Sequence, residues 1–446
     1  MSLMDSFANQ VGAMLASRNA PRRAYERNGQ DRTGYLGGHQ STTEMQERLN
    51  TTAEASLRGS GSPDGVKSGV DRLTGGSPAP IVLMVGTSPE MRGGIASVVA
   101  AFRDGGFFAW ANVRYVITHV QGSHRQKAWQ FLKAISMTIR ILANESVAIV
   151  HAHVSSKGSF WRKALLLWIA RRFGVPTIFH LHSGGFSGFA DHGLGGRVLR
   201  AAIKSTLEAS TTVVVLSERW ADWVREFAPR SRVRVVGNPV RIPDIGYDAR
   251  PPVEPGGSGR VLFLGLICDA KGSFDLLRAW VAFSARVPQW RLVVGGNGEV
   301  DRFLQDAERL GISGEVEYVG WLSGSEKDHQ LSIADIFVLP SYAEGMPVSI
   351  LEAMAFGAAV IATPVGGVPD MMKPEVHGLW VQPGDVAALA QALERLANSP
   401  ELRAKFARAS REHVTLHYST QTVLECLRTV YREVAAAQGD RGDPLS

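Results

Sequence analysis

Cysteines and long apolar runs are scarce in this chain of 446 residues. Its two cysteines, Cys268 and Cys426, cannot build a disulfide framework or a four-cysteine zinc site, and they fit a reducing compartment. The longest apolar run, residues 164–170, is far shorter than the about 18 residues of a membrane span. The first residues include Asp5 and show no basic segment followed by an apolar one, so no export signal is predicted. We therefore expect a cytoplasmic protein.

Acidic residues are scarce in the first half of the folded chain. Residues 78–240 hold 20 Lys/Arg and 8 Asp/Glu, a net charge of +12, whereas residues 241–446 have a net charge of −7. A basic half indicates an anionic partner, and we expect the inner face of a membrane rather than nucleic acid. Dispersed, solvated charge is the alternative. The basic, aromatic-rich stretch 159–173 is either a helix on the membrane surface or a core helix with a basic rim.

Residues 1–77 contain no Ile and no Trp, and their Gly-, Ser- and Pro-rich segments predict a disordered tail. From Ile81 onward, short β-branched runs alternate with helical stretches. The runs are almost continuously apolar, which is typical of parallel strands buried on both faces. The fold class is therefore α/β, with two doubly wound domains. The expected strands are 81–86, 115–120, 147–151, 177–181, 212–216, 233–236, 260–265, 291–295, 316–320, 335–339, 359–362 and 379–381.

Proline and glycine mark the boundary between the two domains. Five prolines fall between Pro239 and Pro255, and two glycines follow them, which predicts a linker. The expected organisation is a tail at 1–77, a first domain at 78–238, a linker at 239–258, a second domain at 259–418, a C-terminal helix at 419–438 and a tail at 439–446.

The most specific motif runs from Glu344 to Glu352, with the sequence Glu-Gly-Met-Pro-Val-Ser-Ile-Leu-Glu, after a predicted strand that ends at Leu339. Open α/β sheets bind ligands beyond the carboxyl ends of their strands. Pro347 suits the first turn of a helix, whose free amides attract a phosphate. The two carboxylates flank that turn, so they can bind sugar hydroxyls on either side of a diphosphate.

The stretch from Glu344 to Gly367 resembles the retaining glycosyltransferases of family 4, which have the GT-B fold of two Rossmann-like domains facing a cleft. The resemblance covers residues 79–437 and is strongest over 259–385. It implies that Glu344 contacts the donor sugar and that Glu352 contacts the ribose of the nucleotide.

The family also carries an Arg and a Lys that neutralise the donor diphosphate. Lys271 matches the Lys, in the segment Gly-Leu-Ile-Cys-Asp-Ala-Lys that starts at Gly265. Leu266 stands where the Arg is expected. Arg92, beside the Gly-rich loop after the first strand, is the expected substitute, because such a loop lets the backbone approach a phosphate.

Histidines end two neighbouring strands of the first domain. His180-Leu-His182 is similar to the strand-end His of the family, which reaches the reacting sugar, and His182 is the better match. His151 and His153 end the preceding strand. Pairs of this spacing chelate metals, but carboxylate partners are missing nearby, so hydrogen-bonded histidines are expected instead. No Asp-x-Asp occurs in the chain, which agrees with a metal-free diphosphate site.

These motifs predict a retaining, metal-independent glycosyltransferase without a cofactor, which moves a sugar from a UDP- or GDP-sugar to an acceptor hydroxyl. The expected acceptor is a lipid-linked oligosaccharide of bacterial exopolysaccharide synthesis. A nucleotide-sugar epimerase of the same fold and a non-catalytic sugar-nucleotide-binding protein are the alternatives. The expected catalytic residues are Glu344, Lys271 and His182. The expected substrate-binding residues are Gly93, Gly94, Arg92, Gly345, Met346, Pro347, Glu352, Gly295 and Gly296.

Overall fold

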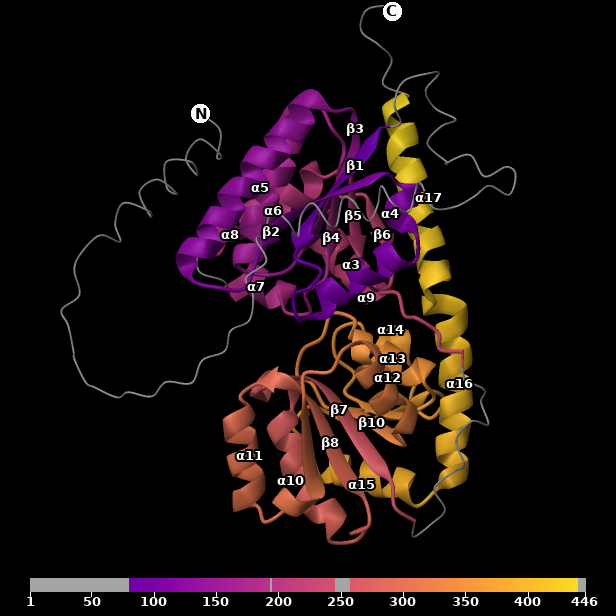
Figure 1. Cartoon of the computed structure of the whole chain (residues 1–446). Coiled ribbons are helices and arrows are strands. Elements are labelled where there is room, and N and C mark those ends of the chain that lie inside the picture. The colour runs from indigo at the N-terminus through magenta and orange to yellow at the C-terminus, as the bar shows by residue number, and fades with distance from the viewer. Residues whose placement is uncertain (1–79, 193–194, 245–256, 440–446) are drawn as a thin grey trace, which may run out of the picture. The chain divides into compact units, whose positions relative to one another are not determined.

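The computed structural model describes residues 80–192, 195–244 and 257–439, all of which belong to one unit. The predicted tail 1–77 and the middle of the predicted linker lie outside the described residues. The domain boundaries therefore stay predictions, whereas the elements within each half are observed (Figure 1).

The first half contains a six-stranded parallel sheet in the order β2-β1-β3-β4-β5-β6. The chain runs outward from β1 to β2 and then returns to add β3 on the other side of β1. This reversal is the switch point at which doubly wound sheets bind ligands. The strands are β1 (Ile81–Thr87), β2 (Val113–His119), β3 (Val147–Val154), β4 (Thr177–Leu181), β5 (Thr212–Val215) and β6 (Val233–Val235).

Helices connect these strands, and several begin at residues that suit a helix start. Ser123 and Gln126 form a reciprocal capping box at the start of α5, and the hydroxyl of Ser217 caps α9. The helices are α3 (Gly94–Asp104), α4 (Phe107–Trp110), α5 (His124–Asn144), α6 (Gly158–Arg172), α7 (Phe186–His192), α8 (Gly196–Ala209) and α9 (Glu218–Phe227).

The second half contains another six-stranded parallel sheet, in the order β12-β11-β10-β7-β8-β9. Its switch point lies between β7 and β10, which are neighbours in the sheet although they are far apart in the chain. β10 and residues 261–264 of β7 are apolar and buried because helices cover both faces. The strands are β7 (Arg260–Ile267), β8 (Arg291–Gly298), β9 (Val316–Gly320), β10 (Ile336–Leu339), β11 (Ala359–Ala362) and β12 (Gly378–Trp380).

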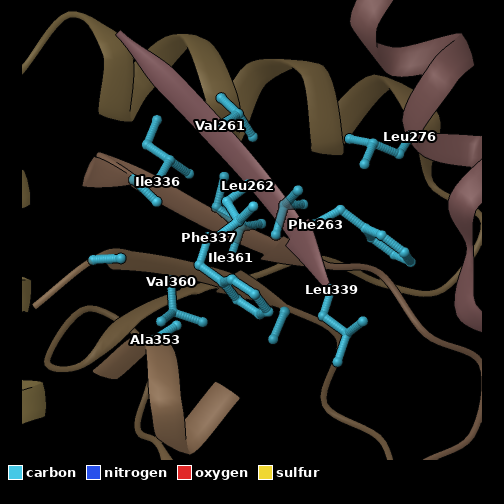
Figure 2. Packing of buried hydrophobic residues seen from close by; sticks show 14 of the residues in the cluster. Val261, Leu262, Phe263, Leu276, Ile336, Phe337, Leu339, Ala353, Val360 and Ile361 are labelled. Atoms are coloured by element: carbon cyan, nitrogen blue, oxygen red, sulfur yellow. The ribbon is translucent and has the colours of Figure 1, made fainter. Parts of the chain in front are cut away.

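The core of the second half is built around β7 and β10. Figure 2 shows Leu262 and Phe263 of β7 beside Phe337 and Leu339 of β10, and all four side chains are almost fully buried. The remaining helices are α10 (Ser273–Ser284), α11 (Val300–Arg309), α12 (Gly324–Ile333), α13 (Val348–Ala355), α14 (Val368–Met371), α15 (Val386–Ala397), α16 (Pro400–Tyr418) and α17 (Thr420–Gly439).

The C-terminal helix α17 packs on the sheet of the first half, not on the half that precedes it in the chain. Val423, Leu424 and Leu427 share a buried cluster with Val82 and Met84 of β1. Figure 1 shows α17, in yellow, continuing from α16 past the strands of the first half. The last helix therefore joins the two halves of the chain physically.

The structure decides between the two readings of the stretch 159–173, which forms α6. The side chains of Phe160, Leu166 and Leu167 are fully buried, and even Lys163 has 0% of its surface exposed. A helix that lies on a membrane must present an apolar face to solvent, which α6 does not do. The membrane interpretation of α6 is wrong, and α6 is a core helix.

Candidate functional site

A cavity of about 470 Å³ lies where the carboxyl ends of β1, β3, β4, β7, β8 and β10 come together. It therefore adjoins the switch points of both sheets, the usual ligand position in such folds. Every site residue predicted from the sequence lines it. The lining includes Arg92, Gly93, Gly94, His182, Lys271, Gly295, Gly296, Glu344, Gly345, Met346, Pro347 and Glu352.

Glu344 lies in the loop between β10 and α13, and only 6% of its surface is exposed. Its Oε1 accepts hydrogen bonds from Lys271 Nζ at 2.5 Å and from Ser341 Oγ at 2.7 Å. A charge-assisted pair of this kind is short and strong. The carboxylate is therefore held in one orientation at the wall of the cavity, with a cation beside it.

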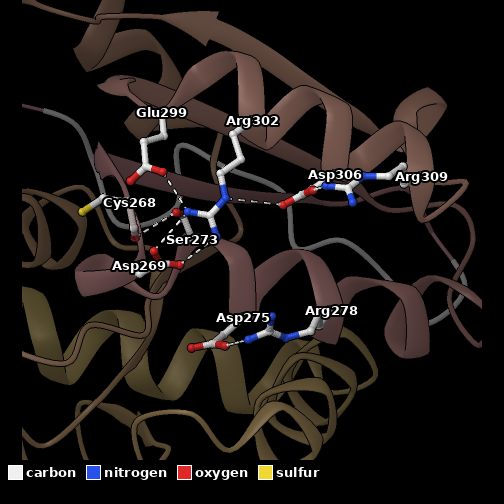
Figure 3. Close-up of polar contacts among 9 residues, drawn as sticks. All are labelled: Cys268, Asp269, Ser273, Asp275, Arg278, Glu299, Arg302, Asp306 and Arg309. Carbon is white, nitrogen blue, oxygen red and sulfur yellow. Dashed lines mark hydrogen bonds and ion pairs between the residues drawn. The ribbon is translucent and has the colours of Figure 1, made fainter.

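Lys271 ends a single turn of 3-10 helix, η1 (Asp269–Lys271), directly after β7. Gly272 follows in the left-handed conformation at φ 66°, and a Cβ there would lie 2.1 Å from the carbonyl oxygen of Pro340. Only glycine fits this turn, which brings Lys271 to the cavity. Figure 3 shows the other end of η1, where Arg302 binds both oxygens of Asp269, at 3.0 and 3.2 Å.

Glu352 lies on α13 and pairs with Lys327 of α12, whose Nζ donates to Glu352 Oε1 at 2.6 Å. Lys327 lines the cavity, and the sequence analysis missed it. No local signal could have found it, because α12 is a polar helix whose lysine resembles any solvated lysine. The pair brings a second cation to the part of the cavity that the second half of the chain forms.

Leu266, at the position where the family carries an Arg, lines the cavity with 48% of its surface exposed. Arg92 lies across the cavity, with its guanidinium 5.7 Å from the ring centre of Trp321. This distance is within the range of a cation–π contact. Within the described residues no carboxylate pairs with Arg92, so its charge is available to a diphosphate, as a substitute for the missing Arg requires.

The strand-end histidines form a buried stack beside the cavity. His153 Nδ1 lies 2.8 Å from His182 Nε2, and His151 Nε2 lies 3.1 Å from His180 Nδ1. The chain of contacts continues from His151 Nδ1 to the hydroxyl of Tyr431 on α17, at 2.6 Å. Burial lowers the pKa values of His151 and His182 to about 3, so both rings are neutral at pH 7. His182 therefore meets the cavity as a neutral hydrogen-bonding group.

One nitrogen from each of His151, His153 and His180 lies within 4.8 Å of the others, a spacing that three metal ligands can have. The rings of His151 and His153 stack, however, with their centres 4.6 Å apart. Burial lowers the pKa of His153 most, and His151, His182 and Lys163, which are all basic groups, lower it further. Burying a dication there without an anion is costly. The surroundings therefore favour a hydrogen-bonded stack over a metal centre.

The stack predicts a loss of stability in acid. In the unfolded chain these rings have a pKa near 6.5, whereas folding lowers the pKa of His151 and His182 to about 3. Between those pH values the unfolded state binds more protons, so stability is complete above pH 6.5 and falls as the pH drops toward 3. Each ring contributes a slope of up to about 1.4 kcal/mol per pH unit. Urea unfolding at several pH values measures this, and His151→Gln is expected to show a shallower slope. Unchanged stability between pH 7 and 4 would contradict the prediction.

Two family descriptions match the chain. Residues 248–413 match "Glycosyl transferases group 1", and residues 87–239 match "Glycosyl transferase 4-like domain". A curated protein named D-inositol 3-phosphate glycosyltransferase, from Saccharomonospora viridis, is 31% identical over 65% of this chain and 70% of its own length.

Solved structures share the fold. A sucrose-phosphate synthase from Thermosynechococcus elongatus superposes with a TM-score of 0.64 at 20% identity, over 80% of this chain and 100% of that one. The Anabaena protein HepE, solved with UDP and glucose, superposes with a TM-score of 0.62 at 16% identity, over 79% of this chain and 100% of its own. The two Rossmann-like halves of this chain thus form a GT-B fold, as the sequence predicted.

Proposed function

Because this chain belongs to the glycosyltransferase group 1 family, we propose that it transfers a sugar from a nucleotide-diphosphate sugar to an acceptor hydroxyl with retention at the anomeric carbon. The match to this family supports glycosyltransferase activity. One observation supports the finer proposal: Glu344 and Lys271 from the second half of the chain line the same open cavity as Arg92 and His182 from the first half. A donor and an acceptor need such a shared space in order to react.

The proposed mechanism assigns the hard step to departure of the nucleoside diphosphate. As the bond between C1 and the phosphate oxygen breaks, negative charge builds on the diphosphate, where Lys271 and Arg92 lie ready to stabilise it. The acceptor oxygen bonds to C1 on the same face, and its proton passes to the departing phosphate oxygen. This route needs no separate general base. Glu344 orients the sugar, Glu352 the ribose, and neutral His182 hydrogen-bonds the sugar near the bond being made.

A screen of UDP- and GDP-sugars tests this proposal, because a selectively bound donor stabilises the folded state. NMR of the product then reports whether the anomeric configuration is retained. Selective donor binding with no turnover, with any acceptor offered, would favour a non-catalytic binding protein. A donor epimerised at C2 would favour an epimerase.

We expect transfer to continue in the presence of EDTA. The cavity is lined by Lys271, Lys327 and Arg92, which supply positive charge to the diphosphate, and the chain lacks an Asp-x-Asp motif. The measurement compares transfer rates with EDTA, with added Mg²⁺ and with added Mn²⁺. Loss of transfer in EDTA followed by rescue with either ion would contradict metal independence.

We also propose that α5 binds an anionic membrane surface, where a lipid-linked acceptor would be found. This helix of 21 residues contains no acidic residue. Trp129 and Leu132 are 61% and 57% exposed, and Lys133 lies 5.7 Å from the Trp129 ring centre. At 100° per residue they share one face with Arg125 and Arg140. Exposed aromatic and aliphatic side chains among cations are the composition of an interfacial helix. No helix in the described residues is long and apolar enough to span a bilayer.

The double variant Trp129→Glu/Leu132→Glu is expected to lose binding to phosphatidylglycerol vesicles in sedimentation. It removes the apolar face and places anions near an anionic surface. Wild-type binding should weaken as salt rises, because the attraction is screened. Leu416→Glu is the matched control, since Leu416 is 67% exposed on α16 in the other half of the chain. Equal loss in the control, or salt-independent binding of the wild type, would contradict the assignment.

A further inference from the structure

Acidic residues are almost absent from one long stretch beside the cavity. Residues 105–190 hold ten Lys/Arg and a single acidic residue, Glu145. The stretch includes β3 and β4, whose carboxyl ends face the cavity, the loop of residues 155–157, and α6, which begins directly after that loop. Positive charge in this part of the fold therefore has few internal partners.

Several of these cations gather behind that loop. The charges of Arg162, Lys163 and Lys127 all act on the ring of His119, which ends β2. The charge of Arg162 also lowers the pKa of Lys163, its neighbour on α6. Every charged group that shifts the pKa of His119 or of Lys163 is thus itself a cation. The guanidinium of Arg162 lies beside Gly158, where a Cβ would be 3.2 Å from Nη1.

Within the described residues, no ion pair joins Lys127, Arg162 or Lys163 to a carboxylate. Arg162 Nε and His119 Nδ1 are buried without a hydrogen-bond partner there. Lys163 has 0% of its surface exposed, and its Nζ donates to Ser159 Oγ at 3.1 Å. Burying a charge without a counter-charge is unfavourable, and the pKa of Lys163 falls to about 7 through burial. Such a cluster is stabilised when an anion binds beside it.

Hydrogen bonds connect this cluster to the wall of the cavity. Ser159 Oγ, which holds the ammonium of Lys163, also accepts from the amide of Ser155 at 3.2 Å. Ser155 lines the cavity. The next hydroxyl, Ser156 Oγ, lies 2.7 Å from Ser183 Oγ, and Ser183 also lines the cavity, next to His182. The positive field of the cluster therefore acts on the wall formed by Ser155, His182 and Ser183, where the acceptor would lie.

We infer that the loop of residues 155–158, together with Arg162 and Lys163, binds a phosphate group carried by the acceptor. This inference rests on the proposed function and names the acceptor class. Arg162 and the serine hydroxyls contact the phosphate, while Lys163 acts through Ser159. The first amides of α6, a helix of 15 residues, add hydrogen-bond donors at the same place. The phosphate belongs either to a lipid-linked diphosphate or to a soluble phosphorylated sugar, which share this chemistry.

The test uses the full chain with its donor site saturated by the nucleotide that the donor screen selects, so that phosphate probes cannot bind there. Farnesyl diphosphate and farnesol are one pair of probes, and glucose 6-phosphate and glucose are the other. Calorimetry is expected to show at least tenfold tighter binding of the phosphorylated member of one pair. Tighter binding of farnesyl diphosphate identifies a lipid-linked acceptor, and tighter binding of glucose 6-phosphate identifies a soluble one.

Arg162→Met is expected to weaken that binding at least tenfold, and Arg172→Met, at the far end of the same helix, to leave it unchanged. Lys163→Met is expected to weaken the binding and to raise the melting temperature, because it removes an unpaired buried charge. Nucleotide binding should be the same in all three variants. Equal binding of the phosphorylated and neutral probes, or unchanged affinity in Arg162→Met, would overturn the inference. Failure of the wild type to bind any nucleotide would instead overturn the proposed function.

Discussion

Lys271→Ala is expected to lower kcat by about 100-fold or more, the scale of losing one preorganised electrostatic donor. Charge develops on the diphosphate only as the glycosidic bond breaks, so the loss should fall on kcat more than on KM. Because Leu266 stands where the family has a second cation, Lys271 should supply an unusually large share of the electrostatic stabilisation of the diphosphate. Steady-state kinetics with the cognate donor measure both constants.

The ion pair between Lys271 and Glu344 complicates this experiment, and a second variant resolves it. Removing the lysine leaves a carboxylate with 6% exposure and no cation at 2.5 Å, which is unfavourable in itself. Glu344→Gln in the Lys271→Ala background neutralises that carboxylate. Glu344→Gln alone is the reference, because Glu344 itself orients the sugar. If the double variant is slower than this reference by about the factor that Lys271→Ala loses, the loss belongs to the diphosphate. If the double variant is as fast as the reference, the lysine serves to pair Glu344, and the phosphate site has been misplaced.

Arg92 provides a further check of the same diphosphate site. If Arg92 stands in for the missing family Arg, Arg92→Ala should also be severe, and Leu266→Arg should partly rescue it. Leu266 is exposed at the cavity, so a longer side chain has room to extend. Lys373→Ala, at a lysine that does not line the cavity, is the matched control for both cations. A full rate in Arg92→Ala would leave Lys327 as the second cation.

Gly184→Ala is expected to lower kcat/KM by about 100-fold, the cost of a misplacement of about 1 Å at a reacting centre. A Cβ on Gly184 would lie 2.0 Å from the carbonyl carbon of Glu344 and 2.4 Å from the amide nitrogen of Gly345. Both clashes are with backbone, so the two loops must move apart. The change separates His182 from Glu344 without touching either side chain.

Gly185→Ala is the matched control, because a Cβ at Gly185 meets nothing within 4 Å. The control should keep the wild-type rate, and both variants should bind nucleotide. Thermal unfolding should show that Gly184→Ala remains folded, since its clash is confined to loops that line the cavity. A wild-type rate in Gly184→Ala would mean that the two loops can separate without harm to the reaction.

The twelve expected strands are all present, several of them one to three residues longer or shorter than expected. Strands buried on both faces need continuous apolar runs, which are visible in any window of the sequence. The segment from Glu344 to Glu352 was recognisable for a related reason. Its proposed function depends on a strand end, a turn and a helix start that follow one another in the chain. The motif could therefore be recognised from consecutive residues alone.

Other features depend on residues that are far apart in the sequence. Lys327 meets Glu352 only because α12 packs near α13, and nothing around Lys327 marks it. For residues 159–173 the basic, aromatic composition allowed either a membrane face or a core helix with a basic rim. The buried side of a helix depends on what packs against it, and the sheet covers α6 while leaving Trp129 of α5 exposed.

The sequence by itself therefore determined the fold class, the strands and the motif residues of the cavity, such as Glu344 and Glu352, because each of these follows from local patterns. Only the tertiary structure decided which charges are paired, which helix face is exposed and where α17 packs. Tyr431, for example, reaches His151 across an interval of 280 residues. Pairing and burial depend on distances between segments, and these distances are set when the apolar faces of both halves are buried together.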